Sequence, residues 1–404
     1  MERSNMLNES FNLLSLQEAM DILGISRATI DRWRKDKQLP HIKIGKEVWI
    51  DKQQLQNWIQ LHGIANMQRP SLSGSLNEKI VTIGYQSGAA LLWSPLIIKQ
   101  LGFFEEELLR MSPSIRYQVR WVNAPNGMEL VEELLAGRVH IASVGDYPII
   151  ASRALSNLLP GFQPQVIAFD GKTSSGGGIS LVVPTGSKVD HPEALSSLSV
   201  STVGNSSSSY RLKEWMNTFG LHSEPIIHRG MGDCLNTILE GQVDASMLWE
   251  PYLSWVQSIG AGTPLLPEGI GGDYLTGLMT DGKWSRENEP IVIAYLKAHL
   301  RAHEFIRNER DRAAELIHQA SGFPLLLVHL VLSKIRWDAS IYSRDLQTLN
   351  RFDEENTNWL SAYKRDSSGL EFRKQFLQEA VEALSLPILP DSPLPGDWST
   401  DHLY

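Results

Sequence analysis

The sequence predicts an α/β protein that carries a small winged helix-turn-helix module at its N-terminus. Three observations indicate this fold class. Residues 15–35 have the pattern of two short helices joined by a tight turn, and residues 41–50 alternate around a glycine as a hairpin does. From residue 79 onward, short apolar strands alternate with helices, which predicts an α/β body with mainly parallel strand pairing. A chain of 404 residues has the length of two or three domains.

The composition is that of a folded protein without a targeting or membrane-spanning segment. Hydrophobic residues make up 42% of the chain and charged residues 21%, which is typical of globular proteins. The first 25 residues contain acidic and amide side chains where a secretory signal would be apolar, and the longest apolar stretch, 323–332, is too short for a membrane span. The single cysteine, Cys234, excludes an intrachain disulfide. We therefore expect a cytoplasmic protein without membrane insertion.

The N-terminal elements have clear local signals. Ser15 and Glu18 form a capping box that starts the first helix. A second helix is expected over 27–35, a hairpin over 41–50, and a third helix after Asp51. Together these elements predict a winged helix-turn-helix.

A series of short motifs runs through this module. They are Gln17-Glu18-Ala19, Leu23-Gly24-Ile25-Ser26-Arg27-Ala28-Thr29-Ile30, Trp33, Leu39-Pro40, Ile44-Gly45-Lys46, Trp49-Ile50, Leu55 and Trp58. In this order and spacing they resemble the excisionase-type, mercury-regulator-like DNA-binding domains, whose second helix enters the major groove and whose wing lies along the DNA backbone or minor groove. The resemblance implies groove contacts from Ser26, Arg27, Thr29 and Arg32, and phosphate contacts from Lys43 and Lys46.

The alternative is that these basic residues form a solvated face and that the module binds protein. Residues 11–52 hold eight Lys and Arg against six Asp and Glu, which is only mildly basic, and the whole chain has a formal net charge of −9. DNA contact must then be local. Because one such module offers few phosphate contacts, we expect a homodimer on an operator with two half-sites.

Composition also divides the chain into parts. The DNA-binding module is expected over 1–62 and a Ser-, Gly- and Pro-containing linker over 63–78. The α/β body follows over 79–390, and a tail rich in Pro and Asp occupies 391–404.

Four strand-to-helix junctions in the body end a strand with small or polar residues and then open a helix with a capping signal. They lie at 83–95, 140–148, 198–210 and 245–251, with Pro148 expected at the first position of its helix. Such junctions present free backbone amides at the positive end of a helix, and in open α/β sheets ligands bind outside the carboxyl ends of strands. We expect the four junctions to line a cleft for a small molecule.

The body also carries motifs that are weak singly but stand in a fixed order. They are Ile83-Gly84-Tyr85-Gln86, Gly102-Phe103-Phe104-Glu105, Leu134-Leu135-Ala136-Gly137-Arg138-Val139-His140-Ile141, Gly145-Asp146-Tyr147-Pro148, Val182-Val183-Pro184, Gly204-Asn205-Ser206-Ser207, Gly241-Gln242-Val243-Asp244-Ala245 and Trp249-Glu250-Pro251-Tyr252. They resemble the periplasmic substrate-binding proteins of the nitrate, sulfonate and taurine uptake class, which share a fold with thiamine-pyrimidine synthases. The resemblance implies a type II periplasmic-binding-protein fold with lobe one over 79–178 and 275–390 and lobe two over 179–274, closed on the ligand by a hinge.

The same resemblance implies the ligand-binding residues. These are Gln86, Ser87, Gly88, Gly145, Asp146, Ser206, Ser207, Ser208, Ser209, Trp249 and Glu250. Serine hydroxyls and helix amides suit an oxyanion such as a sulfonate, whereas Asp146 and Glu250 suit an amine and Trp249 a cation–π contact. We expect an anion or a zwitterion such as taurine. The loops lack Lys, Arg and His, unlike relatives that bind nitrate or bicarbonate. For each of these residues taken alone, the alternative to ligand binding is a role in a tight turn, in the core or as a helix cap.

No catalytic constellation is expected. One cysteine does not match the cysteine-rich motif of thiamine-pyrimidine synthases, no GxSxG, P-loop or GxGxxG motif is present, and the eleven histidines are expected to include no pair at metal-ligand spacing. We therefore predict a non-enzymatic protein without cofactor or metal.

The predicted function is a cytoplasmic, ligand-sensing transcriptional regulator. Closure of the lobes on a small anion or zwitterion would change operator affinity. The alternative is the solute-binding component of an ABC uptake system for sulfonate, taurine or nitrate-like compounds. We expect that role to require a signal peptide.

Overall fold

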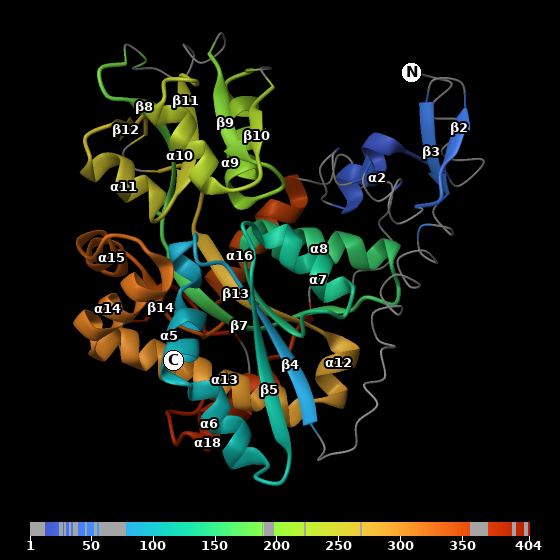
Figure 1. Ribbon diagram of the computed structural model, residues 1–404, viewed down its shortest axis with the longest axis vertical. Helices are drawn as coiled ribbons and strands as arrows, with labels where there is room; N and C mark the ends of the chain where they lie inside the picture. Colours follow the sequence, from blue (N-terminus) through green and yellow to red (C-terminus); the bar gives the residue numbers. More distant parts are fainter. Residues whose placement is uncertain are drawn as a thin grey trace.

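The computed structural model contains three sheets, one in the N-terminal module and one in each lobe of the body (Figure 1). It describes residues 13–23, 27, 30, 31, 34, 39–44, 47–51, 55, 78–187, 189, 198–221, 224–266, 269–355, 371–389, 393–399, 403 and 404. Among these residues, no helix combines the length and apolar character that crossing a membrane requires. The predicted fold class is confirmed: a two-lobed α/β body follows a small module with a wing.

The module forms as its local signals predict. Its described elements are β1 (Leu13–Ser15), α2 (Leu16–Leu23), β2 (Ile42–Ile44) and β3 (Glu47–Asp51). The capping box is present, because the Glu18 amide donates to Ser15 Oγ at 3.2 Å and the Ser15 amide donates to Glu18 Oε2 at 2.7 Å. The hairpin of β2 and β3 is antiparallel, and β1 pairs with the other side of β3. The third helix is described only at Leu55.

Lobe one holds the larger sheet, of seven strands in the order β14-β7-β13-β6-β4-β5, with β15 also paired to β7. Its elements are β4 (Glu78–Tyr85), η1 (Ala90–Leu92), α5 (Ser94–Leu101), α6 (Phe103–Met111), β5 (Arg116–Asn123), α7 (Gly127–Leu135), β6 (Ile141–Gly145), α8 (Asp146–Leu158), β7 (Pro164–Thr173), β13 (Tyr274–Asp281), α12 (Gly282–Glu287), α13 (Glu289–Asn308), α14 (Arg310–Ser321), α15 (Leu325–Leu332), β14 (Arg336–Trp337), α16 (Ser343–Glu355), β15 (Glu371–Phe372) and α18 (Lys374–Ala383).

Lobe two holds a five-stranded sheet in the order β10-β9-β11-β8-β12. Its elements are β8 (Ile179–Pro184), β9 (Val200–Val203), α9 (Ser207–Thr218), β10 (Ile226–His228), α10 (Met231–Leu239), β11 (Ala245–Trp249), α11 (Tyr252–Ser258) and β12 (Gly262–Pro264).

The prediction of mainly parallel pairing is wrong, because both sheets are mixed. Strands β4, β5 and β6 pair in parallel, as do β9, β10 and β11. However, β13 runs antiparallel to both β6 and β7, and β8 runs antiparallel to β11 and β12. The chain passes between the lobes twice, once between Thr173 of β7 and Ile179 of β8 and once between Pro264 of β12 and Tyr274 of β13. These two connecting segments are called the crossings. Two parallel strands that follow each other in the chain must be joined by a crossover, usually a helix. A strand that enters its sheet from the other lobe has no such crossover to its neighbours, and it pairs with them antiparallel.

The two crossings touch each other at glycines. The first crossing contains Gly176 and the second contains Gly269, both with positive φ, at 75° and 85°. A Cβ on Gly269 would lie 2.0 Å from the backbone oxygen of Gly176, which no side chain tolerates. These glycines let the two connecting segments lie against each other, where a hinge is expected.

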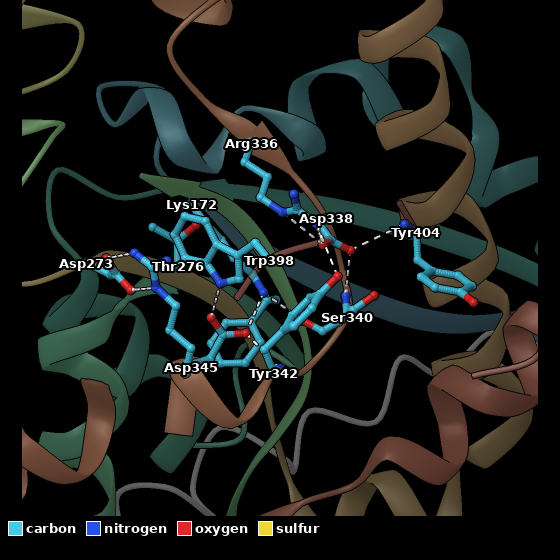
Figure 2. Close-up of polar contacts among 12 residues, drawn as sticks. Lys172, Asp273, Thr276, Arg336, Asp338, Ser340, Tyr342, Asp345, Trp398 and Tyr404 are labelled. Atoms are coloured by element: carbon cyan, nitrogen blue, oxygen red, sulfur yellow. Dashed lines mark hydrogen bonds and ion pairs between the residues drawn. The ribbon is translucent and has the colours of Figure 1, made fainter. Parts of the chain in front are cut away.

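The described part of the tail packs on lobe one through buried charges (Figure 2). The fully buried Lys172 ammonium lies 2.6 Å from Asp345 Oδ2, and the indole of Trp398, in the tail, donates to Asp345 Oδ1 at 2.8 Å. The rings of Phe169, Tyr342 and Trp398 surround the ammonium at 4.4–5.9 Å from their centroids. A buried ammonium needs a counter-charge, and these contacts supply both the charge and aromatic faces.

We predict that Asp345→Asn destabilises the protein by about 3–5 kcal/mol, because it removes the charge of the one carboxylate that directly contacts the buried Lys172 ammonium among the described residues. Urea unfolding followed by circular dichroism measures this change. The matched control is Glu309→Gln, whose ion pair with Arg312 is solvent-exposed and should contribute little. Equal midpoints for the two variants would contradict the prediction.

Candidate ligand-binding site

The structure brings all four predicted junctions to the surface where the lobes face each other. The junctions after β4 and β6 belong to neighbouring strands of lobe one, and those after β9 and β11 to neighbouring strands of lobe two. Helices follow as expected, except that α8 begins at Asp146, two residues before the predicted start, so Pro148 is its third residue. A proline is tolerated there because the first-turn amides have no intrahelical partner.

The loop after β4 combines one buried and two partly open residues. Gln86 is buried, and its Nε2 donates to the Ser143 carbonyl at 3.1 Å. The Ser87 amide donates to Asn123 Oδ1 at 3.0 Å, while Asn123 Nδ2 donates to Ser87 Oγ at 2.9 Å. Gly88 is in contact with lobe two, since a Cβ there would lie 3.2 Å from the Tyr252 hydroxyl. Gln86 thus holds the loop, and the other two residues remain partly exposed to a ligand.

The serine loop is mainly a helix cap. Ser206 caps α9: its Oγ accepts from the Ser209 amide at 3.2 Å, and Ser209 Oγ accepts from the Ser206 amide at 2.9 Å. Ser208 Oγ is buried and contacts Ser206 Oγ and Thr202 Oγ1. The capping alternative therefore describes the hydroxyls of Ser206 and Ser209, while the Ser208 hydroxyl is buried against two other hydroxyls.

Ser207 instead faces lobe one. Its Oγ accepts from the Tyr147 amide at 3.4 Å, and a Cβ on Gly145 would lie 2.7 Å from that oxygen. Gly145 is thus a glycine because the other lobe approaches its backbone closely.

A buried ion pair joins the lobes beside this contact. Arg211, one turn into α9, reaches Asp146 with its two terminal nitrogens at 2.7 and 3.2 Å. The same guanidinium donates to the backbone oxygens of Ser207 and Asp273. The interpretation of Asp146 as the partner of a ligand amine is therefore wrong, since the carboxylate is already neutralised. The signal for Arg211 was its position four residues after Ser207 on the same helix face.

Glu250 is neutralised as well. It is buried and accepts from the amide and the hydroxyl of Ser254 at 3.0 and 2.7 Å, and the Lys334 ammonium lies 3.1 Å from its Oε1. The Trp249 indole donates to the Gly88 carbonyl at 2.8 Å, and the Ala90 amide donates to the Glu250 carbonyl at 2.9 Å. These two residues connect the lobes, and neither carboxylate of the expected amine site is free for an amine.

A third connection lies at the exposed edge of the interface. Arg229 of lobe two makes a two-pronged contact with Glu129 of lobe one at 2.7 and 2.8 Å, and Asn126 donates to the Arg229 carbonyl at 3.1 Å. The Arg229 side chain is 74% exposed, unlike the buried Arg211. With contacts beside the crossings, in the middle and at the edge, the structure has the lobes closed on each other.

Two polar residues of the interface were missed by the sequence analysis. Asn123 ends β5 and holds the Ser87 loop, and the half-buried Tyr252 hydroxyl faces Gly88. Asn123 is the last residue of a strand in which exposed and partly buried residues alternate, and Tyr252 belongs to the motif from Trp249 to Tyr252. Both residues therefore had a local signal in the sequence. Together with Ser87, they offer neutral hydrogen-bond donors to a ligand.

Of the predicted DNA contacts, the structure describes one side chain. Arg27 is helical, and its side chain is 62% exposed and lies 3.2 Å from Asp31. Ser26, Thr29, Arg32 and Lys46 lie outside the described residues, and Lys43 is described only as part of β2.

One histidine pair contradicts the expectation that none stands at metal-ligand spacing. His299 and His303 lie four residues apart on α13, are both buried, and converge with Asp170 of β7. All three residues belong to lobe one.

Comparison with known proteins agrees with the two-part architecture. Residues 13–61 match the family described as "Helix-turn-helix domain". The body is similar to the "Putative aliphatic sulfonates-binding protein" of Bacillus subtilis (strain 168), with 26% identity over 272 residues, 66% of this chain and 77% of that protein.

Solved structures show the same fold for the body. The alkanesulfonate-binding protein SsuA from Xanthomonas axonopodis pv. citri, bound to MOPS, superposes with a TM-score of 0.55 at 18% identity, covering 72% of this chain and 95% of that one. The periplasmic nitrate-binding protein NrtA from Synechocystis PCC 6803 superposes with a TM-score of 0.59 at 12% identity, covering 80% and 93%. The body therefore has a periplasmic-binding-protein fold, and these relatives are named as binding proteins.

We predict that Arg211→Met destabilises the protein by about 3–5 kcal/mol, because Asp146 then stays buried without its counter-charge. Adding Asp146→Leu should restore part of the loss. Arg229→Met, at the exposed pair, is the control and should change the free energy of unfolding by less than about 1 kcal/mol. Urea unfolding of the three variants checks the order, and similar losses for Arg211→Met and Arg229→Met would refute it.

Proposed function

We propose that this chain is a cytoplasmic transcriptional regulator in which a small organic anion, of the sulfonate type, binds between the lobes and changes the affinity of the N-terminal module for DNA. The observation that carries the proposal is the physical contact between the two parts. Helix α2 of the module lies against α8 of lobe one, and α8 begins at Asp146 in the interlobe surface. One helix therefore touches both the ligand site and the helix-turn-helix.

The contact between the parts is apolar. Leu16 and Ala19 of α2 belong to the same cluster of buried side chains as Ile149, Ile150 and Leu155 of α8. Such a packed contact favours discrete arrangements, so a shift of α8 on lobe closure would be passed to α2. Regulation by ligand follows if the open and closed lobes hold α2 differently.

The ligand class follows from the groups left open at the interface. Ser87, Asn123 and Tyr252 offer neutral donors, while Asp146 and Glu250 carry protein counter-charges. Hydroxyl and amide donors suit a sulfonate oxygen and give an ammonium group no free carboxylate. The sulfonate named for the B. subtilis relative supports this choice over a taurine-like zwitterion.

The alternative is a solute-binding component of an ABC uptake system for sulfonate, taurine or nitrate-like compounds. The names of the relatives favour it for the body alone, but it gives the N-terminal module no role. Under the regulator proposal, the module acts as a homodimer on two half-sites, because its few phosphate contacts need to be doubled.

The binding half of the proposal is tested by fluorescence titration of the intact chain with short alkanesulfonates. Tyr252→Phe and Ser87→Ala should each weaken binding about 3- to 10-fold, because each removes one hydrogen bond worth about 0.5–1.5 kcal/mol. Ser258→Ala, on an exposed hydroxyl at the far end of α11, is the control and should leave the affinity unchanged. Unaltered affinity in both interface variants would exclude this placement of the ligand.

The regulatory half is tested by fluorescence anisotropy with DNA from upstream of the protein's own gene, with and without a saturating sulfonate. We expect the ligand to change DNA affinity about 5- to 150-fold, the range of ordinary allosteric coupling. Arg27→Ala should weaken DNA binding, whereas the exposed Arg312→Ala on α14 should not. Ligand binding without any change in DNA affinity would reject the regulator and leave the uptake component.

A further inference from the structure

A second polar cluster lies inside lobe one, away from the interlobe surface. His299 and His303 stand one turn apart on α13, Asp170 lies on β7, and Ser94 begins α5. All four side chains are fully buried, and one donor atom from each of Asp170, His299 and His303 lies within 4.8 Å of the others. The binding and regulatory roles proposed above do not use these groups.

The outer nitrogens of both imidazoles are fixed by backbone oxygens. His299 Nε2 lies 2.9 Å from the Phe169 carbonyl, and His303 Nδ1 lies 3.0 Å from the Tyr404 backbone oxygen. A backbone oxygen of either kind, amide or carboxylate, accepts hydrogen bonds here, so each of these nitrogens carries a hydrogen. In a neutral imidazole the other nitrogen is then an acceptor, and in both residues that nitrogen points into the cluster.

Inside the cluster, hydrogen-bond acceptors outnumber the hydrogens that side chains can donate to them. His303 Nε2 lies 2.9 Å from Asp170 Oδ1, which places one acceptor against another. Ser94 Oγ contacts both Asp170 Oδ2, at 2.7 Å, and His299 Nδ1, at 3.2 Å, but has a single hydrogen for the two. Two imidazole lone pairs and a carboxylate therefore converge in a buried site, where the Ser94 hydroxyl and the Gly171 amide, which donates to Asp170, leave acceptors unsatisfied, so a cation among them is favourable.

The protonation states agree with this count. Burial lowers the pKa of His299 and of His303 to about 3 and raises the pKa of the Asp170 carboxyl to about 6. At pH 7 both imidazoles are therefore neutral and the carboxyl is mainly ionised. Neutral imidazole nitrogen and carboxylate oxygen are the forms that bind metal ions.

We propose that this cluster binds a divalent transition-metal ion, zinc by the chemistry of its donors, through His299 Nδ1, His303 Nε2 and the Asp170 carboxylate. Two imidazoles and one carboxylate are a common zinc set, and Ser94 Oγ, which contacts both Asp170 and His299, offers a further oxygen. The bonds from the outer ring nitrogens to backbone oxygens are those that orient metal-binding histidines in known sites.

The proposed ion has a structural role. It joins α13 to β7, next to the start of α5, and the backbone oxygen that accepts from His303 belongs to Tyr404 and also accepts from the Ala339 amide at 2.8 Å. Binding would therefore stabilise lobe one and hold the described end of the tail. Because the site is fully buried, the ion must enter while the chain folds.

The test is the metal content of the intact, untagged chain from cells grown with added zinc, measured by plasma mass spectrometry. We expect about one zinc per chain, and a loss of most of it in His303→Gln and in the isosteric Asp170→Asn. His329→Gln, a half-exposed histidine on α15, is the control and should keep the metal. Circular dichroism of each variant establishes that it is folded.

A second measurement keeps the test independent of the variants. The wild-type chain, unfolded and refolded with cobalt(II), should show the visible absorption bands of a four-coordinate nitrogen–oxygen site, and zinc should abolish them. Folded wild-type protein that contains no stoichiometric zinc and shows no cobalt bands would overturn the proposal and leave a proton shared by Asp170 and His303. Zinc that remains at full content in both folded variants would also overturn it.

Discussion

The ion pair between Asp146 and Arg211 is the interaction on which the arrangement of the body depends. A carboxylate buried in lobe one is stable only with a cation beside it, and that cation comes from lobe two. The guanidinium also binds the backbone oxygen of Asp273, at the crossing that leads back into lobe one. One buried charge therefore fixes the start of α8, the first turn of α9 and the end of a crossing at the same point.

The Asp273 side chain extends this constraint toward the tail. It accepts from the Ser175 amide at 3.0 Å in the other crossing and pairs with Arg344 of α16 at 2.5 and 2.7 Å (Figure 2). The guanidinium of Arg344 in turn lies 4.5 Å from the centre of the Trp398 ring. Buried or half-buried charges thus connect the tail, both crossings and the interlobe surface. The tail, which had no functional interpretation from its composition, is part of the structure that holds the crossings.

What the sequence allowed us to predict is what local signals determine. The capping box at Ser15 and the strand-to-helix junctions with their capping signals depend on residues within a few positions of one another, and the structure contains them. Contacts between distant segments were not predictable in this way, because no local pattern pairs Arg211 with Asp146 across 65 positions or Lys172 with Asp345 across 173. The antiparallel strands were missed for the same reason. The His299–His303 pair was different, because its spacing was visible.

The distribution of charge also limits how a ligand can act. A ligand shifts the balance between open and closed lobes only by the difference in its affinity for the two states. Here the lobes already meet through two ion pairs. The buried Asp146–Arg211 pair lies near the crossings and is weakened little by salt, whereas the exposed Arg229–Glu129 pair is weakened by salt. Under the proposed function, the buried pair would keep the lobes in register with each other, and the exposed pair together with the ligand's neutral hydrogen bonds would decide closure. If open and closed lobes differ by a few kcal/mol, as two-state proteins commonly do, a small anion would be able to change the position of α8 and, through their contact, of α2.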